Sequence, residues 1–299
     1  MILDARSGLL IALGVVGAFH LVSIGRVVAQ ARRDASVGVP GPTAIAIGFV
    51  TNFFDTLGIG SFAPTTAAFR FFKTVPDDRI PGTLNVGHTI PTMIEAAIFI
   101  QAVQVDPTTL ISMLVAAVLG AWLGAGVVSR WPRRQIQFGM GICLFVAALL
   151  LLAKVLGVAP AAGVASGVTG TKLVVAVGAN FILGALMTLG IGLYGPCLIL
   201  VSLLGMNPKA AFPIMMGSCA FLMPMASARF TRTRRFDLKA SLGLIIGGAP
   251  AVLIGALIVK SLPLTQVIWL VVAVVLYTSV TMLRASRVAD APVAVAETV

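Results

Sequence analysis

The sequence is poor in charge. Only 10% of its 299 residues are Asp, Glu, Lys or Arg, whereas 59% are apolar, and the mean hydropathy is +1.05. A soluble domain needs charged groups on its outside, so this scarcity argues against a soluble protein. Uncharged stretches of roughly 20 residues, the length that a bilayer core requires, recur along the chain. The sequence therefore predicts an all-α membrane protein.

Cysteine is also scarce, and the usual catalytic motifs are missing. Cys143, Cys197 and Cys219 lie in apolar runs without CxxC spacing, which argues against a disulfide framework or a structural zinc site. No Walker-type phosphate loop occurs, and no metal-ligand spacing is seen. We therefore expect no cofactor, no metal and no enzymatic activity. Whether Cys197 or Cys219 contacts a substrate stays open.

The net charge of +11 does not indicate a nucleic-acid partner. The basic residues stand in short clusters between apolar runs, as the positive-inside rule expects of cytoplasmic loops. The excess of positive charge is therefore interpreted as a topology signal. Membrane lipid is the predicted surrounding of the chain, and the sequence leaves homo-oligomerisation open.

What the chain does contain is a duplicated motif. Residues Thr56–Gly60 read TLGIG and are followed by Pro64; the same five letters recur at Thr188–Gly192, 132 positions later, followed by Pro196. Glycine and proline weaken a helix, so their duplication inside long apolar runs predicts two helix breaks with a shared purpose.

Charge counting distinguishes two ways of placing the broken stretches. If both are re-entrant hairpins, 16 of the 21 Lys and Arg residues lie on the cytoplasmic side and 5 outside. If both cross the membrane fully, the split is 12 to 9. The positive-inside rule favours the re-entrant arrangement, with the N-terminus outside and the C-terminus in the cytoplasm, in the plasma (inner) membrane of a bacterium.

This arrangement predicts inverted-topology repeats, with about seven spanning helices plus two broken re-entrant hairpins. Each repeat contains a hairpin and three crossings, and an odd number of crossings inverts the second repeat. Such repeats are the common plan of secondary transporters, whose substrate site lies where the breaks meet. The predicted segments are an N-terminal helix with a basic loop (1–41), repeat one (42–157), an external linker (158–170), repeat two (171–286) and a cytoplasmic tail (287–299).

The breaks themselves are candidate anion sites. A half-helix that begins at a break offers unpaired N–H groups and the positive end of its dipole. Coordination of a cation by freed carbonyl groups is the competing use of the same geometry. The candidate substrate-binding residues are Asn52, Thr56, Gly58, Gly60, Ser61, Pro64, Asn85, Thr188, Gly190, Gly192, Tyr194 and Pro196.

Ionisable residues within the apolar runs are candidates for proton coupling. His88 and Glu95 share one face of the helix that follows the first break, and Asp55 precedes that break. Ionisable groups at membrane depth are costly and mark a pathway or a proton relay. Asp55, His88 and Glu95 are therefore candidate proton-coupling residues, with a purely structural buried pair as the alternative.

These features resemble a known family. The duplicated glycine-rich break with its trailing proline, together with the segments Gly120–Ala125 and Arg130–Arg134, is similar to the TauE/SafE sulfite exporters, also called TSUP permeases. Where a Gly-Gly-Gly run is typical of that family, this chain has Gly58-Ile59-Gly60-Ser61.

The resemblance implies a secondary transporter that exports a small sulfur-containing anion, sulfite or an organosulfonate such as sulfoacetate. The alternatives are a transporter or channel for another small anion, such as a carboxylate or thiosulfate, and, last, an intramembrane enzyme. The anion, the direction, the coupling ion and the oligomeric state are left open by the sequence.

Overall fold

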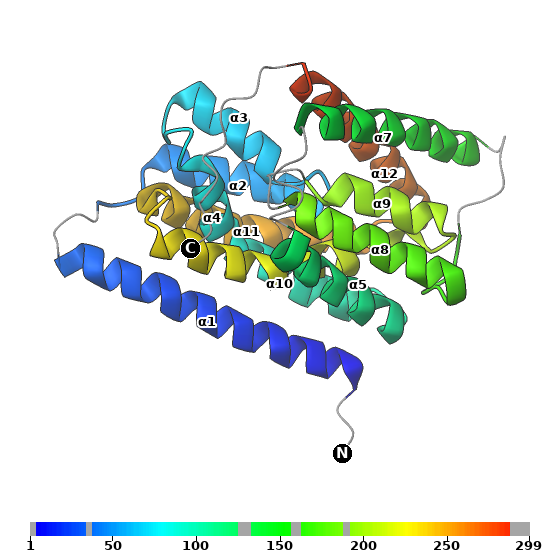
Figure 1. The fold of residues 1–299 in the computed structure, drawn as a ribbon, viewed down its shortest axis with the longest axis horizontal. Coiled ribbons are helices and arrows are strands. Elements are labelled where there is room, and N and C mark those ends of the chain that lie inside the picture. The colour runs from blue at the N-terminus through cyan, green and yellow to red at the C-terminus, as the bar shows by residue number, and fades with distance from the viewer. Residues whose placement is uncertain (1–3, 34–37, 125–132, 157–162, 188–191, 288–299) are drawn as a thin grey trace.

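The computed structural model describes residues 4–33, 38–124, 133–156, 163–187 and 192–287, and they form a helical bundle (Figure 1). Within these ranges the extended backbone is limited to one isolated bridge, between Ala165 and Met206. The prediction of an all-α membrane protein is confirmed. The elements are α1 (Ala5–Arg33), α2 (Pro42–Thr56), α3 (Phe62–Phe72), α4 (Ile80–Ala102), α5 (Pro107–Leu119) with a π-helical extension (Gly120–Gly124), α7 (Arg133–Val155), α8 (Gly170–Met187), α9 (Tyr194–Leu203), a 3₁₀ turn (Pro208–Ala210), α10 (Ala211–Arg232), α11 (Leu238–Ser261) and α12 (Leu264–Ala285).

Five segments in the described part of the chain are long and apolar enough to cross a membrane: α1, α8, the 3₁₀ turn with α10, α11 and the larger part of α12. Four of them are among the seven predicted spanning helices, whereas α8 is the first half of the second broken stretch. The predicted span α4 falls outside this group because its buried face carries polar residues such as His88 and Glu95. The number of spanning helices stays a prediction.

The first predicted break is present between α2 and α3. Gly58 and Gly60 have φ of +91° and +86°, in the left-handed region that only glycine adopts at little cost. A right-handed helix cannot include these angles, so α2 ends at Thr56 and α3 begins at Phe62. The second predicted break falls between α8 and α9, where residues 188–191, including Thr188 and Gly190, lie outside the described residues.

The bundle has two ends that differ in charge. At one end α3, α10 and α12 finish with Arg70, Arg232 and Arg284 in their last turns. We call it the basic end. The side-chain nitrogen of Lys239 approaches Gly38, just before α2, at this same end. The α2–α3 hairpin therefore begins and finishes at the basic end.

The α8–α9 hairpin is anchored at the opposite end. Lys172, at the start of α8, donates through Nζ to the carbonyl oxygen of Leu204, just after α9, at 3.1 Å. Lys209 makes a similar bond to the carbonyl oxygen of Leu262 at 2.9 Å. The two hairpins thus enter the bundle from opposite ends, and the beginnings of α3 and α9 both lie in its interior (Figure 1).

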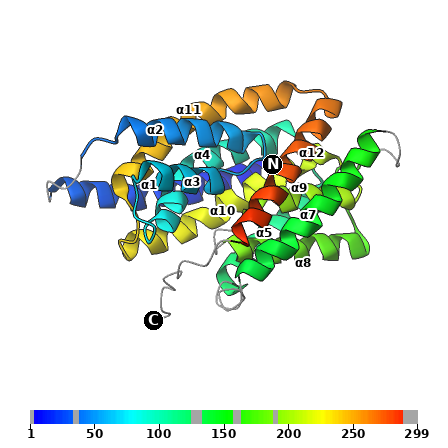
Figure 2. The ribbon, with the colours of Figure 1, turned by 90° about the horizontal axis from the view of Figure 1, so that it is seen from above.

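Helices from the two halves of the chain pack closely against each other. In Figure 2, α11 runs beside α2 along one edge, and α12 runs beside α7 along another. Glycines permit close contacts of this kind: between α11 and α2, a Cβ on Gly247 would lie 2.0 Å from the Ile45 carbonyl oxygen, and between α8 and α5, one on Gly184 would lie 2.1 Å from the Ala117 carbonyl oxygen. Each hairpin is therefore supported by a helix from the other half, as small residues allow in membranes.

The same order of helices occurs twice in the chain. Phe62 and Tyr194, the first residues of α3 and α9, are 132 positions apart, which is the offset of the duplicated motif. Between the halves, the rings of Phe99 in α4 and Phe212 in α10 stack with centroids 5.2 Å apart. The division into inverted repeats at 42–157 and 171–286 stays a prediction.

Candidate functional site

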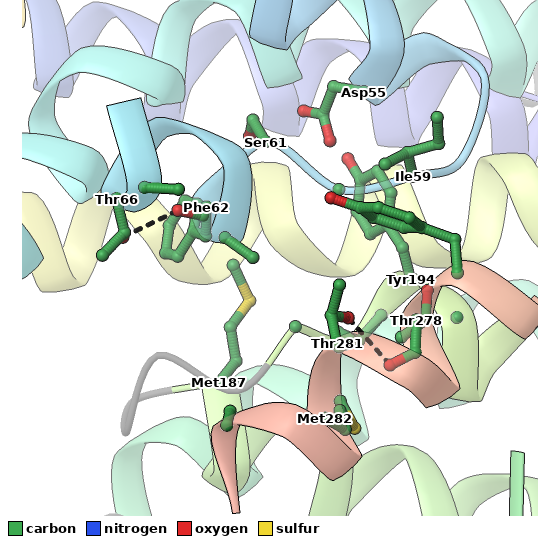
Figure 3. A pocket seen from close by; sticks show the side chains of 18 of the residues that line it. Asp55, Ile59, Ser61, Phe62, Thr66, Met187, Tyr194, Thr278, Thr281 and Met282 are labelled. Atoms are coloured by element: carbon green, nitrogen blue, oxygen red, sulfur yellow. Dashed lines mark hydrogen bonds between the residues drawn. The ribbon is translucent and has the colours of Figure 1, made fainter. Parts of the chain in front are cut away.

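A cavity of about 310 Å³ lies between the first break and the beginning of α9 (Figure 3). The first break contributes Asp55 and residues 59–63, and the second contributes residues 192–195. The remaining wall comes from Thr66, Ala67 and Arg70 of α3, Thr92 of α4, Gln137 of α7, Met187 of α8, Cys219 and Met223 of α10, and Tyr277, Thr278, Thr281, Met282 and Ala285 of α12. Segments far apart in the sequence therefore line one common space.

Five of the predicted substrate-binding or proton-coupling residues line this cavity: Asp55, Gly60, Ser61, Gly192 and Tyr194. The others in the described part of the chain lie outside its lining: Asn52, Thr56, Gly58, Pro64, Asn85, His88, Glu95 and Pro196. Thr188 and Gly190 fall outside the described residues. The duplicated motif therefore borders the cavity with only part of its residues.

Two of the residues outside the lining have side chains or positions directed elsewhere. A Cβ on Gly58 would point at the Leu198 side chain, 3.3 Å away, so this glycine faces α9 and not the cavity. The Asn85 side-chain amide donates to the carbonyl oxygen of Pro81, one turn earlier in the same helix, at 2.9 Å. The Asn85 amide group is therefore bound within its own helix.

Asp55 stands in the last turn of α2 and is only 2% exposed. The Ser61 side chain, just before α3, lies beside the Asp55 carboxyl group (Figure 3). A carboxylate at the C-terminus of a helix is disfavoured by the dipole, whereas one at an N-terminus is favoured. The break therefore places the Asp55 carboxyl group at the N-terminus of the next half-helix.

Glu95 is fully buried on α4, next to the second break. The Tyr194 hydroxyl, from the first turn of α9, donates to Glu95 Oε2 at 3.2 Å. The other carboxyl oxygen, Oε1, is buried without a hydrogen-bond partner. Asp55 lies close enough for the two carboxyl groups to interact electrostatically. Two such groups cannot both carry an uncompensated negative charge in the interior. Either a proton neutralises one of them, or another cation offsets the charge.

His88 is part of a separate hydrogen-bonded chain. Its Nδ1 is 2.9 Å from Asn52 Oδ1, and its Nε2 is 3.0 Å from Thr65 Oγ1. The Asn52 amide nitrogen already donates to the Gly48 carbonyl oxygen at 2.7 Å, so the amide oxygen faces the ring and accepts from Nδ1. The Thr65 hydroxyl can then donate to Nε2. His88 thereby ties α4 to both halves of the first hairpin.

The sequence analysis missed the wall formed by α12. Thr278 and Thr281 face the cavity, and their hydroxyl groups donate to the carbonyl oxygens of Val274 and Thr278 at 2.8 and 2.9 Å. The Thr278 side chain occupies the space next to Gly195, where an added Cβ would lie 2.8 Å from its Cγ2. Polar residues in an otherwise apolar helix are the signal that could have identified this wall.

Cys197 and Cys219 differ in their position relative to the cavity. Cys219 lines the cavity, with its sulfur 3.3 Å from Met187 Sδ, whereas Cys197 is fully buried outside the lining. Across the described ranges, no group of three or more His, Cys, Asp or Glu side chains could hold a metal ion. Among the described lining residues, Arg70 is the single basic side chain.

The family model of the sulfite exporter TauE/SafE matches residues 3–151, about half of the chain. This segment contains the first break together with Asp55, His88 and Glu95. The chain belongs to the TauE/SafE family. The resemblance inferred from the breaks is thereby confirmed, and the protein is a membrane transporter of the family that moves sulfite or related anions. No curated protein and no solved structure matches the chain.

Proposed function

We propose that this transporter exports a small sulfur-containing anion, sulfite or an organosulfonate such as sulfoacetate, and holds it between the facing breaks. The observation that carries the proposal is that the first residues of α3 and α9 line one cavity. Helix N-termini attract anions through their unpaired N–H groups and their dipoles. Two such termini directed into one space favour a single oxyanion.

The prolines of the duplicated motif fit this role. Pro64 and Pro196 are the third residues of α3 and α9, where a backbone N–H has no intrahelical partner to lose. Proline there stabilises the start of each half-helix without weakening it. Two N–H groups before each proline, at Phe62 and Ala63 in α3, stay available to a ligand.

The proposal includes a membrane orientation. The positive-inside rule favours a cytoplasmic position for the basic end, which holds Arg70, Arg232 and Arg284. The cavity lining reaches the exposed residues Ala67 and Ala285 on that side. In the proposed orientation this arrangement corresponds to a state open to the cytoplasm, ready to load an anion for export. The N-terminus then lies outside and the C-terminus inside, in a bacterial inner membrane.

Asp55 and Glu95 carry the coupling proton in this proposal. Both are buried and interact with each other; Asp55 lines the cavity, Glu95 is bonded to the lining residue Tyr194, and Glu95 Oε1 is free of any hydrogen-bond partner. A buried carboxyl pair of this kind needs a neutralising proton and can release it when the cavity becomes hydrated. The two ring nitrogens of His88 both have hydrogen-bond partners, so His88 is assigned a structural role, holding α4 against α2 and α3.

The function can be tested with the purified protein in liposomes. We expect saturable uptake of sulfite or sulfoacetate that responds to an imposed pH gradient, with acetate and thiosulfate as competing anions. Flux that never saturates and ignores the pH gradient would indicate a channel. Movement of none of these anions by folded protein would refute the proposal.

A pair of glycines tests whether the first break must keep its shape. Gly60 has positive φ, whereas Gly192 does not, and a Cβ on either would meet open space. We expect Gly60→Ala to lower stability by about 1–2 kcal/mol, the cost of a left-handed residue, and to reduce transport strongly. Gly192→Ala adds the same methyl group to the cavity without strain and should leave stability unchanged. Thermal unfolding and liposome uptake are measured for both variants. Equal effects of the two substitutions would contradict the requirement for a left-handed residue at position 60.

A further inference from the structure

Arg70 lies between two cavities at the basic end. The inner one is the 310 Å³ cavity at the breaks. The outer one, about 490 Å³, is lined by Phe69, Arg70, Lys73, Val75, Pro76 and Asp77. Arg70 is the one residue that the two described linings share, so its side chain can contact a ligand in either space.

The outer cavity already contains a carboxylate bound to Arg70. Arg70 Nε donates to Asp77 Oδ1 at 2.9 Å, and the two side chains are 56% and 62% exposed. An ion pair this exposed contributes about 0–1 kcal/mol, so a dissolved anion can displace Asp77. The chain reaches this position because Lys73 closes α3 with a left-handed φ of 51° and turns it back toward Arg70.

We infer that Arg70 and Lys73 form an outer anion site that captures the oxyanion group of the substrate before it reaches the breaks, with Asp77 as an internal competitor. This inference rests on the proposed function. A guanidinium recognises sulfite, sulfonate and carboxylate oxygens through paired charge-assisted hydrogen bonds. Exchange of Asp77 for the substrate frees Arg70 to turn from the outer cavity to the inner one.

The site predicts opposite effects for its two partners. Arg70→Gln removes a charge-assisted contact and should raise the KM for sulfite about tenfold or more at low salt, with the maximal rate little changed. Arg70→Lys should recover part of this loss. Asp77→Asn removes the competitor and should lower KM by roughly two- to fivefold, the range of an exposed ion pair. Raising the ionic strength should shrink both effects because the site is exposed.

Matched controls separate the site from general surface charge. Asp78→Asn removes the same charge at the next position, which is exposed and outside the lining of the outer cavity. Arg232→Gln removes a positive charge from the basic end at a position that lines neither cavity. We expect both variants to keep the KM of the unmodified protein.

The experiment measures initial rates against sulfite concentration in liposomes sorted so that the basic end faces the bath. An unchanged KM for Arg70→Gln, or equal effects of Asp77→Asn and Asp78→Asn, would overturn the inference while the proposed function stands. If the unmodified protein moves no anion, the proposed function fails instead. Thermal-shift titration of the same variants with sulfite then decides: Asp77→Asn must bind more tightly than the unmodified protein, Arg70→Gln more weakly, and equal affinities would refute the site.

Discussion

Replacing Glu95 by glutamine is expected to abolish transport driven by a pH gradient while leaving exchange of labelled for unlabelled substrate intact. Glutamine has the size of glutamate and still offers an acceptor to the Tyr194 hydroxyl, now 3.2 Å from Glu95 Oε2. It cannot bind and release a proton. Because Glu95 Oε1 is buried without a partner, the substitution leaves the rest of the hydrogen-bond network unchanged. Exchange needs no net movement of protons, so it should survive.

The measurement compares uptake against a pH gradient with counterflow at equal pH, in the same liposome preparation. Tyr194→Phe serves as one control, since it removes the hydrogen bond and keeps the carboxyl group. His88→Gln serves as the second, because His88 lies outside the lining and bonds to Asn52 and Thr65. The His88→Gln variant should have lower stability than the unmodified protein but should keep pH-driven uptake. Normal pH-driven uptake by Glu95→Gln would remove Glu95 from the coupling mechanism.

The second large effect is expected at a helix contact. A Cβ on Gly184 would lie 2.1 Å from the carbonyl oxygen of Ala117, far inside the distance that carbon and oxygen tolerate, and both groups belong to helix backbones. Gly184→Ala must therefore push α8 away from α5. Overpacking of this kind costs about 1–3 kcal/mol or more, so we expect a large fall in stability and poor yields of folded protein.

Gly178 provides the matched control on the same helix. It is exposed, and a Cβ there would have nothing within 4 Å. Because alanine favours a helix over glycine by up to about 1 kcal/mol, Gly178→Ala should be neutral or slightly stabilising. Thermal unfolding of the two detergent-solubilised variants measures the difference. Similar melting temperatures would mean that the α5–α8 contact yields more easily than its geometry suggests.

The break at residues 57–61 could be predicted from the sequence because its cause is local. Gly58 and Gly60 adopt angles that a helix excludes, and those residue types are visible in the letters. The apolar composition likewise predicts helices, since the backbone groups of a membrane chain must bond within their own segment. Both inferences depend on neighbours in sequence and need no knowledge of packing.

The convergence of side chains at the cavity could not be predicted in the same way. Glu95 and Tyr194 are 99 positions apart, and their contact depends on how α4 crosses the second hairpin. Helices that are apolar on all sides carry little periodicity to say which face is turned inward. For that reason the sequence grouped His88 with Glu95, whereas the structure places His88 in a chain with Asn52 and Thr65.

The sequence by itself determined the helical membrane class, the position of the first break and the TauE/SafE resemblance, because composition, glycine and proline act locally. Tertiary structure alone decided that Glu95 meets Tyr194 and that α12 supplies Thr278 and Thr281 to the wall. It also placed Arg70 between two cavities. These features arise from contacts between distant helices, where close glycine packing and not residue spacing sets which side chains meet.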